Sequence, residues 1–221
     1  MATLLKVNNT LIPINITAPL GTFSGNLEDA VLMRQASLFT EPFYSNSTVS
    51  YIADMAFAYC NSLTSINFTQ CQEIGSYAFA DCRSLTTAIF PECDIIGLCA
   101  FYNCYNLSII SFPKSTLLSN YAFYSCSKLT MASFSKCSQI YSSVFTFCVS
   151  LFSLYLLTSS IPTLSDTSTF YSTPISTYGS IRGSIFVKAS LLTAFKTATN
   201  WSVYSARMVG LTDEQIAALG T

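Results

Sequence analysis

The sequence predicts a repeat solenoid of the α/β class, with mostly short parallel strands, irregular outer turns and a cap at each end. Two observations predict it. One set of residue types recurs every 22 residues through the middle of the chain, and the apolar residues, 51% of the total, are spread evenly rather than gathered in one segment. Stacked repeats suit this pattern because each coil covers the apolar face of its neighbour.

Five units keep the 22-residue step without a slip, which predicts regular repeats over residues 51–160. Their consensus is I-x-x-x-A-F-x-x-C-x-x-L-x-x-I-x-F. The Phe column is Phe57, Phe79, Phe101, Phe123 and Phe145, the Cys column is Cys60, Cys82, Cys104, Cys126 and Cys148, and the Leu column is Leu63, Leu85, Leu107, Leu129 and Leu151.

Each unit divides into a strand and a return turn. The stretch from Leu63 to Ile74 fits the leucine-rich-repeat pattern L-x-x-L-x-L-x-x-N/C-x-L. Alternating Ile66 and Phe68 indicate one short strand per coil, with one buried face. The motif beginning Ala56-Phe57 forms the outer turn. There the small Ala allows neighbouring coils to approach closely, and the Phe fills the interior between them.

The two ends depart from the period, and we expect them to cap the stack. Residues 1–50 are the predicted N-terminal cap, with a lead-in strand within 38–44 that pairs with the first repeat. Residues 161–221 are the predicted degenerate repeat and C-terminal cap. Within them, 161–187 form a sixth repeat with an insertion, in which Thr169-Phe170 takes a displaced Ala-Phe position.

Short helices are expected near the C-terminus. Ser190 is the predicted N-cap of the first, and Thr212 with Gln215 forms a capping-box pattern for the last, with Gly220 beyond its end. Trp201 is expected to seal the last coil. The apolar residues of the first helix are Leu191, Leu192 and Phe195.

Charge and hydropathy exclude two classes of partner. The net charge is −1 and only 10% of residues are charged, so we expect no nucleic acid. Mean hydropathy is +0.45. However, the longest apolar runs, such as Leu154 to Leu157, are far shorter than the roughly 18 residues of a spanning helix, so we expect no membrane insertion. Residues 1–9 lack the basic and apolar regions of a secretory signal.

Catalysis is not expected, and neither is a cofactor or a metal. The chain has no histidine, which excludes Ser-His-Asp and Cys-His nucleophile systems and histidine-containing zinc sites. It also has no phosphate-binding glycine loop. Asp81, Glu92 and Asp94 lie close in sequence, as a glycosidase pair would. We interpret them as solvated residues of an outer turn.

The nine cysteines are interpreted as packing residues. Five form the Cys column, and Cys71, Cys93 and Cys137 follow the strand, in a series completed by Ser115 and Ser159. Only Cys99 stands outside both series. No C-x-x-C pair exists. Period-locked cysteines with an odd count favour buried free thiols over disulfides or metal ligands.

The exposed face of the strands is the predicted binding surface. Its outward columns carry no charge, so a ligand there would be a protein or a neutral carbohydrate. The predicted outward residues form three columns along the stack, and the third column ends at Leu157. The candidate binding residues are the larger apolar and aromatic members, Ile89, Ile109, Met131 and Tyr155.

The segment Ile74-Gly75-Ser76-Tyr77-Ala78-Phe79-Ala80-Asp81-Cys82-Arg83-Ser84-Leu85 resembles the repeats of BspA-like leucine-rich-repeat proteins. This resemblance implies a surface-exposed adhesion protein that binds matrix proteins or cell surfaces, located at the cell surface or outside the cell. Two alternatives remain open: a structural or host-recognition protein carried by a phage or prophage, and a spacer with no ligand. The sequence does not indicate an oligomeric state.

Overall fold

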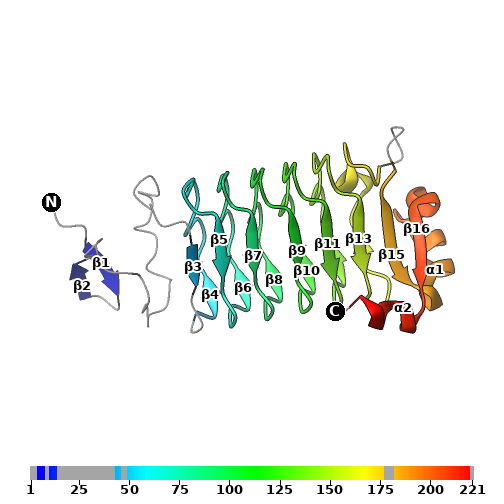
Figure 1. Ribbon diagram of the computed structural model, residues 1–221, viewed down its shortest axis with the longest axis horizontal. Coiled ribbons are helices and arrows are strands. Elements are labelled where there is room, and N and C mark those ends of the chain that lie inside the picture. Colours follow the sequence, from blue (N-terminus) through cyan, green and yellow to red (C-terminus); the bar gives the residue numbers. More distant parts are fainter. Residues whose placement is uncertain (1–3, 8–9, 14–42, 46–48, 177–181, 220–221) are drawn as a thin grey trace.

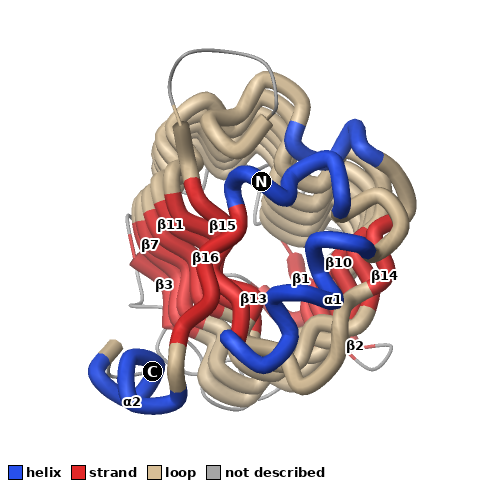
Figure 2. The backbone as a smooth tube through the Cα atoms, turned by 90° about the vertical axis from the view of Figure 1, so that its right-hand side faces the viewer, coloured by secondary structure: helices blue, strands red, loops and turns tan. Residues whose placement is uncertain are grey.

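The computed structural model describes residues 4–7, 10–13, 43–45, 49–176 and 182–219. Its main body is a stack of coils that runs along the long axis of the molecule (Figure 1). Viewed from the end, the strands form two sheets on opposite sides of the stack, and loops close each coil between them (Figure 2). The predicted leucine-rich-repeat solenoid is therefore confirmed.

The larger sheet has eight strands, and all its neighbours are parallel. Parallel pairing follows because every coil returns to the same side before its next strand begins. In spatial order the strands are β16 (Met208–Leu211), β15 (Ser184–Lys188), β13 (Ser153–Leu156), β11 (Met131–Phe134), β9 (Ile109–Ser111), β7 (Thr87–Ile89), β5 (Ser65–Asn67) and β3 (Phe43–Ser45).

A second sheet of six parallel strands shows that the expectation of one strand per coil was wrong. Each strand has only two residues, the second of which is the buried Ile or Leu that opens the sequence unit. Two residues are too few to show the alternation that marks a strand. The strands are β14 (Thr163–Leu164), β12 (Gln139–Ile140), β10 (Leu117–Leu118), β8 (Ile95–Ile96), β6 (Glu73–Ile74) and β4 (Tyr51–Ile52).

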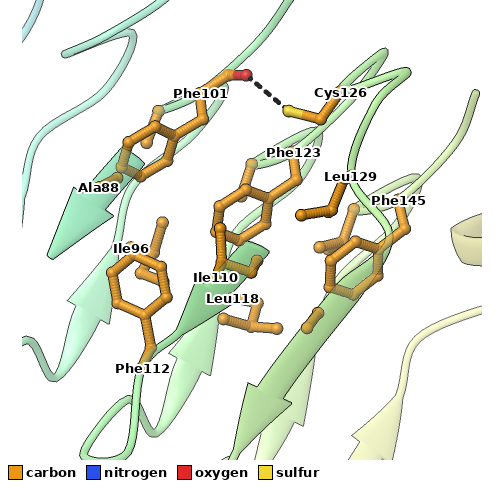
Figure 3. Packing of buried hydrophobic residues seen from close by; sticks show 14 of the residues in the cluster. Ala88, Ile96, Phe101, Ile110, Phe112, Leu118, Phe123, Cys126, Leu129 and Phe145 are labelled. Carbon is orange, nitrogen blue, oxygen red and sulfur yellow. Dashed lines mark hydrogen bonds between the residues drawn. The ribbon is translucent and has the colours of Figure 1, made fainter. Parts of the chain in front are cut away.

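The Phe column forms a continuous stack through the core. Phe101 lies parallel to Phe79 and to Phe123, with ring centroids 5.2 Å apart in both pairs. Phe90 and Phe112, which directly follow β7 and β9, contact the same ring from the side at 6.1 Å. All five side chains are completely buried. Figure 3 shows how this packing joins three successive coils.

The outer turns are hydrogen-bonded from coil to coil. The Phe57 amide donates to the Ala78 carbonyl at 2.7 Å, and the Phe101 amide donates to that of Ala122 at 2.7 Å. The Ala column is completely buried, as predicted from its small size. Close approach also explains Gly97, because a Cβ there would lie 2.7 Å from the carbonyl oxygen of Ile74. Each Leu amide of the Leu column donates to the Cys carbonyl three residues earlier, and the strands of successive coils pair with a 22-residue offset, so the coils are in register.

The degenerate repeat forms a sixth coil. Phe170 is stacked on Phe145 at 5.9 Å, although it follows Phe145 by 25 residues instead of 22. It lies in the 3-10 helix η2 (Thr167–Phe170), whose N-cap is Asp166. Residues 177–181 of the predicted insertion lie outside the described part of the chain.

Short helices close the C-terminal end of the stack (Figure 2). Trp201 seals it as expected: its side chain is 1% exposed, and its Nε1 donates to the Pro162 carbonyl at 2.7 Å. The capping box of Thr212 and Gln215 is confirmed. The elements are η3 (Ala189–Leu191), α1 (Leu192–Thr197), η4 (Ser202–Arg207) and α2 (Asp213–Ala218).

The predicted N-cap at Ser190 was wrong. Ser190 lies inside η3, and α1 begins after Leu191, without a side-chain cap. The 3-10 turn moves the start of the helix by one residue, because the N-cap of α1 is Leu191. Phe195 of α1 is buried.

The N-terminal region is described in part. β1 (Leu4–Val7) pairs with β2 (Thr10–Pro13) in antiparallel register. The lead-in strand is present as β3, which pairs with β5 of the first repeat. Residues 38–42 of the prediction, and Gly220 at the other end of the chain, lie outside the described residues.

Candidate functional site

The candidate site is the outward face of the eight-stranded sheet from β5 to β16, which we call the strand face. Each strand from β5 to β15 buries alternate side chains and directs the others to solvent. Ile109 is 50% exposed and Ile89 is 44% exposed, while Met131 and Tyr155 are half-buried. The structure therefore places all four predicted residues on this face.

Strand register brings the apolar residues into two groups. Ile109 pairs with Met131 across β9 and β11. Tyr155 pairs with Phe186, which in turn pairs with Val209. The Tyr155 and Phe186 rings are stacked, with centroids 4.6 Å apart and planes 15° apart.

Phe186 and Val209 extend the site beyond the residues predicted from the sequence. Both lie after the regular repeats, where the 22-residue period no longer assigns a column. The alternation of Ile185, Phe186 and Val187 was the available signal, since it marks a strand with one outward aromatic residue. Val209 is 40% exposed on the edge strand β16.

The strand face is almost free of charge. The outward residues of β5 to β13 are uncharged, and Lys188 at the end of β15 is half-buried. Leu157 does not belong to this face: it is 5% exposed, so its predicted outward position was wrong. It directly follows β13, and its amide still donates to the carbonyl of Phe134, the last residue of β11, at 3.1 Å.

The described cysteines are buried free thiols, and those of the Cys column have a specific hydrogen-bonding role. Cys126 Sγ donates to the Phe101 carbonyl of the preceding coil at 3.2 Å (Figure 3). Three other members of the column make the same contact, at 2.9–3.1 Å. A thiol is small and apolar, yet it supplies a weak donor for a second carbonyl lone pair. This contact explains why cysteine occupies the column.

The second cysteine series also donates to backbone. Cys71 Sγ donates to the Glu73 carbonyl at 3.2 Å, and burial raises the pKa of this thiol to about 12. Burial likewise raises the pKa of Cys137 to about 12. Ser115 donates in the same way to Leu117. Ser159 was the wrong last member, because Thr158 is the buried residue there, and its hydroxyl donates to the Ser160 carbonyl.

The described residues do not form a cluster of three or more His, Cys, Asp or Glu that could hold a metal. The three carboxylates noted in the sequence lie in two different turns. Asp81 is 8% exposed, so its expected solvation was wrong; it accepts hydrogen bonds from Arg83 and Asn103. Glu92 and Asp94 lie in the short turn between β7 and β8, where Glu92 forms an ion pair with Lys114.

Together, the coil geometry and the uncharged strand face define a leucine-rich-repeat scaffold. The family model for the BspA type leucine rich repeat region matches residues 50–176 with six copies. The chain belongs to this family. The sixth copy agrees with the coil built around Phe170. A comparison with curated proteins gives no match.

Two solved structures share the fold. The pneumococcal vaccine antigen PcpA is 15% identical, with a TM-score of 0.57 over 79% of this chain and 41% of that one. A leucine-rich repeat protein from Bacteroides ovatus is 16% identical, with a TM-score of 0.51 over 85% of this chain and 56% of that one. The chain therefore spans about half the length of these proteins. In the described part of the chain, no helix is long and apolar enough to cross a membrane.

Proposed function

We propose that the chain is a non-enzymatic adhesion module, displayed outside the cell, that binds a protein partner through the strand face. The observation that carries the proposal is the pair of apolar groups held in register: Ile109 with Met131, and Tyr155 with Phe186 and Val209. Aliphatic and aromatic side chains on a rigid uncharged sheet are typical of the centre of a protein interface. The likeness to a vaccine antigen supports an external location.

A protein fits this face better than a charged ligand does. The face from β5 to β13 offers no charged side chain to hold a phosphate or a sulfate. Its exposed isoleucines also lack the hydrogen-bonding groups that orient a sugar. Affinity should therefore come from apolar burial, and binding should change little between low and moderate salt.

The test replaces Ile109 and Met131 with Lys together and measures binding to an array of matrix proteins. The matched control is Ile95→Lys with Leu117→Lys, because these residues are also register neighbours but lie on the six-stranded sheet. We expect I109K/M131K to lose at least tenfold in affinity and the control to bind as the parent does. Equal binding by both variants would move the site elsewhere, and no binding by the parent would favour a spacer.

A further inference from the structure

A second exposed feature lies on the outer turns, away from the strand face. Five aromatic rings there contact one another across four successive coils, and we call them the aromatic ridge. Tyr102 stacks on Tyr124 at 4.9 Å, and Tyr124 also contacts Tyr121 edge to face at 5.7 Å. Phe147 contacts Tyr124 at 5.4 Å and Tyr171 at 5.7 Å, again edge to face.

Three of the five rings of the ridge are exposed, and Tyr102 and Tyr124 are half-buried. Tyr171 is 56% exposed, Tyr121 is 40% exposed and Phe147 is 38% exposed. Phe147 meets Tyr124 at 89° and Tyr171 at 81°, so in each contact the edge of one ring lies against the face of the other. The ridge therefore presents ring faces and edges along the direction of the stack.

Backbone conformation indicates that these rings are not there for packing. Tyr121 and Phe147 have φ angles of 58° and 61°, in the left-handed region that disfavours bulky side chains. The same positions in other coils hold Ser143 and Asn103, with φ angles of 58° and 59°, but also Tyr77 and Tyr59, with φ angles of 57° and 64°. Small polar residues therefore satisfy the fold. Strained aromatic residues that stay exposed point to recognition rather than to stability.

We propose that the aromatic ridge binds a linear neutral polysaccharide. Aromatic faces pack against the C–H faces of sugar rings, and Tyr hydroxyls can exchange hydrogen bonds with sugar hydroxyls. The ring centroids of Tyr124 and Phe147 are 5.4 Å apart, and those of Phe147 and Tyr171 are 5.7 Å apart. Both distances are close to the length of one hexopyranose unit in an extended chain. One or two rings per coil thus match successive units of a linear polymer.

Charge excludes the polyanions that also stack on aromatic residues. Segments 97–104, 119–126 and 141–148, which carry four of the five rings, contain no charged residue. Single-stranded nucleic acid needs cations beside the stacking platform. Asp166, near Tyr171, accepts hydrogen bonds from Ser142 and Ser168 and would repel a polyanion.

The test uses the folded chain in native gels containing hydroxyethyl cellulose, xylan or mannan. The variant is Tyr121→Ser with Phe147→Asn, in which each ring is replaced by the residue that this chain carries at the same position of another coil. We expect at least one polymer to retard the parent, and the variant to lose at least tenfold in affinity with its thermal midpoint preserved. I109K/M131K, altered only on the strand face, should be retarded like the parent.

The outcomes separate this proposal from the binding function of the strand face. If no polymer retards the folded parent, or if the ridge variant is retarded as strongly as the parent, the ridge is not a polysaccharide site. If the double variant fails to fold, Tyr171→Ala at the most exposed ring gives the same comparison. Loss of retardation in I109K/M131K alone would assign the polysaccharide to the strand face and overturn the proposal.

Discussion

Replacing Phe101 with Ala tests whether the stacked coils stabilise one another through the Phe column. Phe101 is completely buried and contacts four other Phe rings, two in parallel stacks at 5.2 Å and two from the side at 6.1 Å. Removing a buried Phe costs about 3–5 kcal/mol through lost burial and a residual cavity. Four lost aromatic contacts place Phe101→Ala toward the upper end of that range, near ~5 kcal/mol.

The assay is thermal unfolding followed by circular dichroism, with urea unfolding as a second measure. For a chain of this size each kcal/mol lowers the midpoint by about 2–4 °C, so we expect a fall of roughly 10–20 °C. Phe152→Ala is the matched control, because that ring is 43% exposed, and it should change stability by no more than about 0.5 kcal/mol. A midpoint for Phe101→Ala within a degree of the parent would refute the reasoning.

Three further predictions concern the ionisable groups. Burial raises the pKa of Cys71 and Cys137 from 9.0 to about 12, so their stabilising contribution is complete below pH 9.0 and is lost as pH rises toward 12. The free energy of unfolding in urea should therefore be lower at pH 10.5 than at pH 8. This decrease should be smaller in the double variant Cys71→Ser with Cys137→Ser, in which Ser takes the place that Ser115 has in its own coil. A thiol reagent should label the native protein slowly, and it should label all nine thiols once denaturant is added. Cys99 should react first because it is the most exposed cysteine, at 4%. Rapid labelling of the Cys column would contradict the burial of these thiols. Burial tends to raise the pKa of Asp166, but hydrogen bonds from Ser142 and Ser168 outweigh this effect and lower the pKa. The Asp166 carboxylate therefore stabilises the fold above about pH 3.9, and this contribution disappears as pH falls through the folded-state pKa. Asp166→Ala should cost about 1 kcal/mol at pH 7 and less at pH 3, as measured by urea unfolding, and an equal cost at both values would show that its charge does not matter.

The coil core was predictable from the sequence because its contacts repeat. A Phe every 22 residues must stack on the next Phe if each coil has the same path, and the structure confirms this from Phe57 to Phe145. Burial of the cysteines followed from the same periodicity. Trp201 and the capping box at Thr212 were found because each has a local signal that does not depend on neighbouring coils.

The remaining features depend on backbone path, which residue types encode weakly. The second sheet has two-residue strands, and the outer turns place residues as unlike as Tyr121, Ser125 and Asn103 in the same left-handed region. Asp81 is buried because Arg83 and Asn103 reach it, a contact that spacing alone does not reveal. Phe186 and Val209, which extend the strand face, lie beyond the end of the 22-residue period. The aromatic ridge combines residues from different repeat positions, so no single column showed it.

The coil-to-coil hydrogen bonds have a consequence for how such a gene can change in length. Because each coil contacts the coil before it and the coil after it in the same way, removing residues 97–118 would bring Phe79 onto Phe123 with the same kind of contact that each ring now makes with Phe101. A deletion or duplication of 22 codons would thus remove or insert one whole layer without new joints at the surface. Unequal recombination between repeats could lengthen or shorten the molecule in single steps, while the two ends keep their own structures.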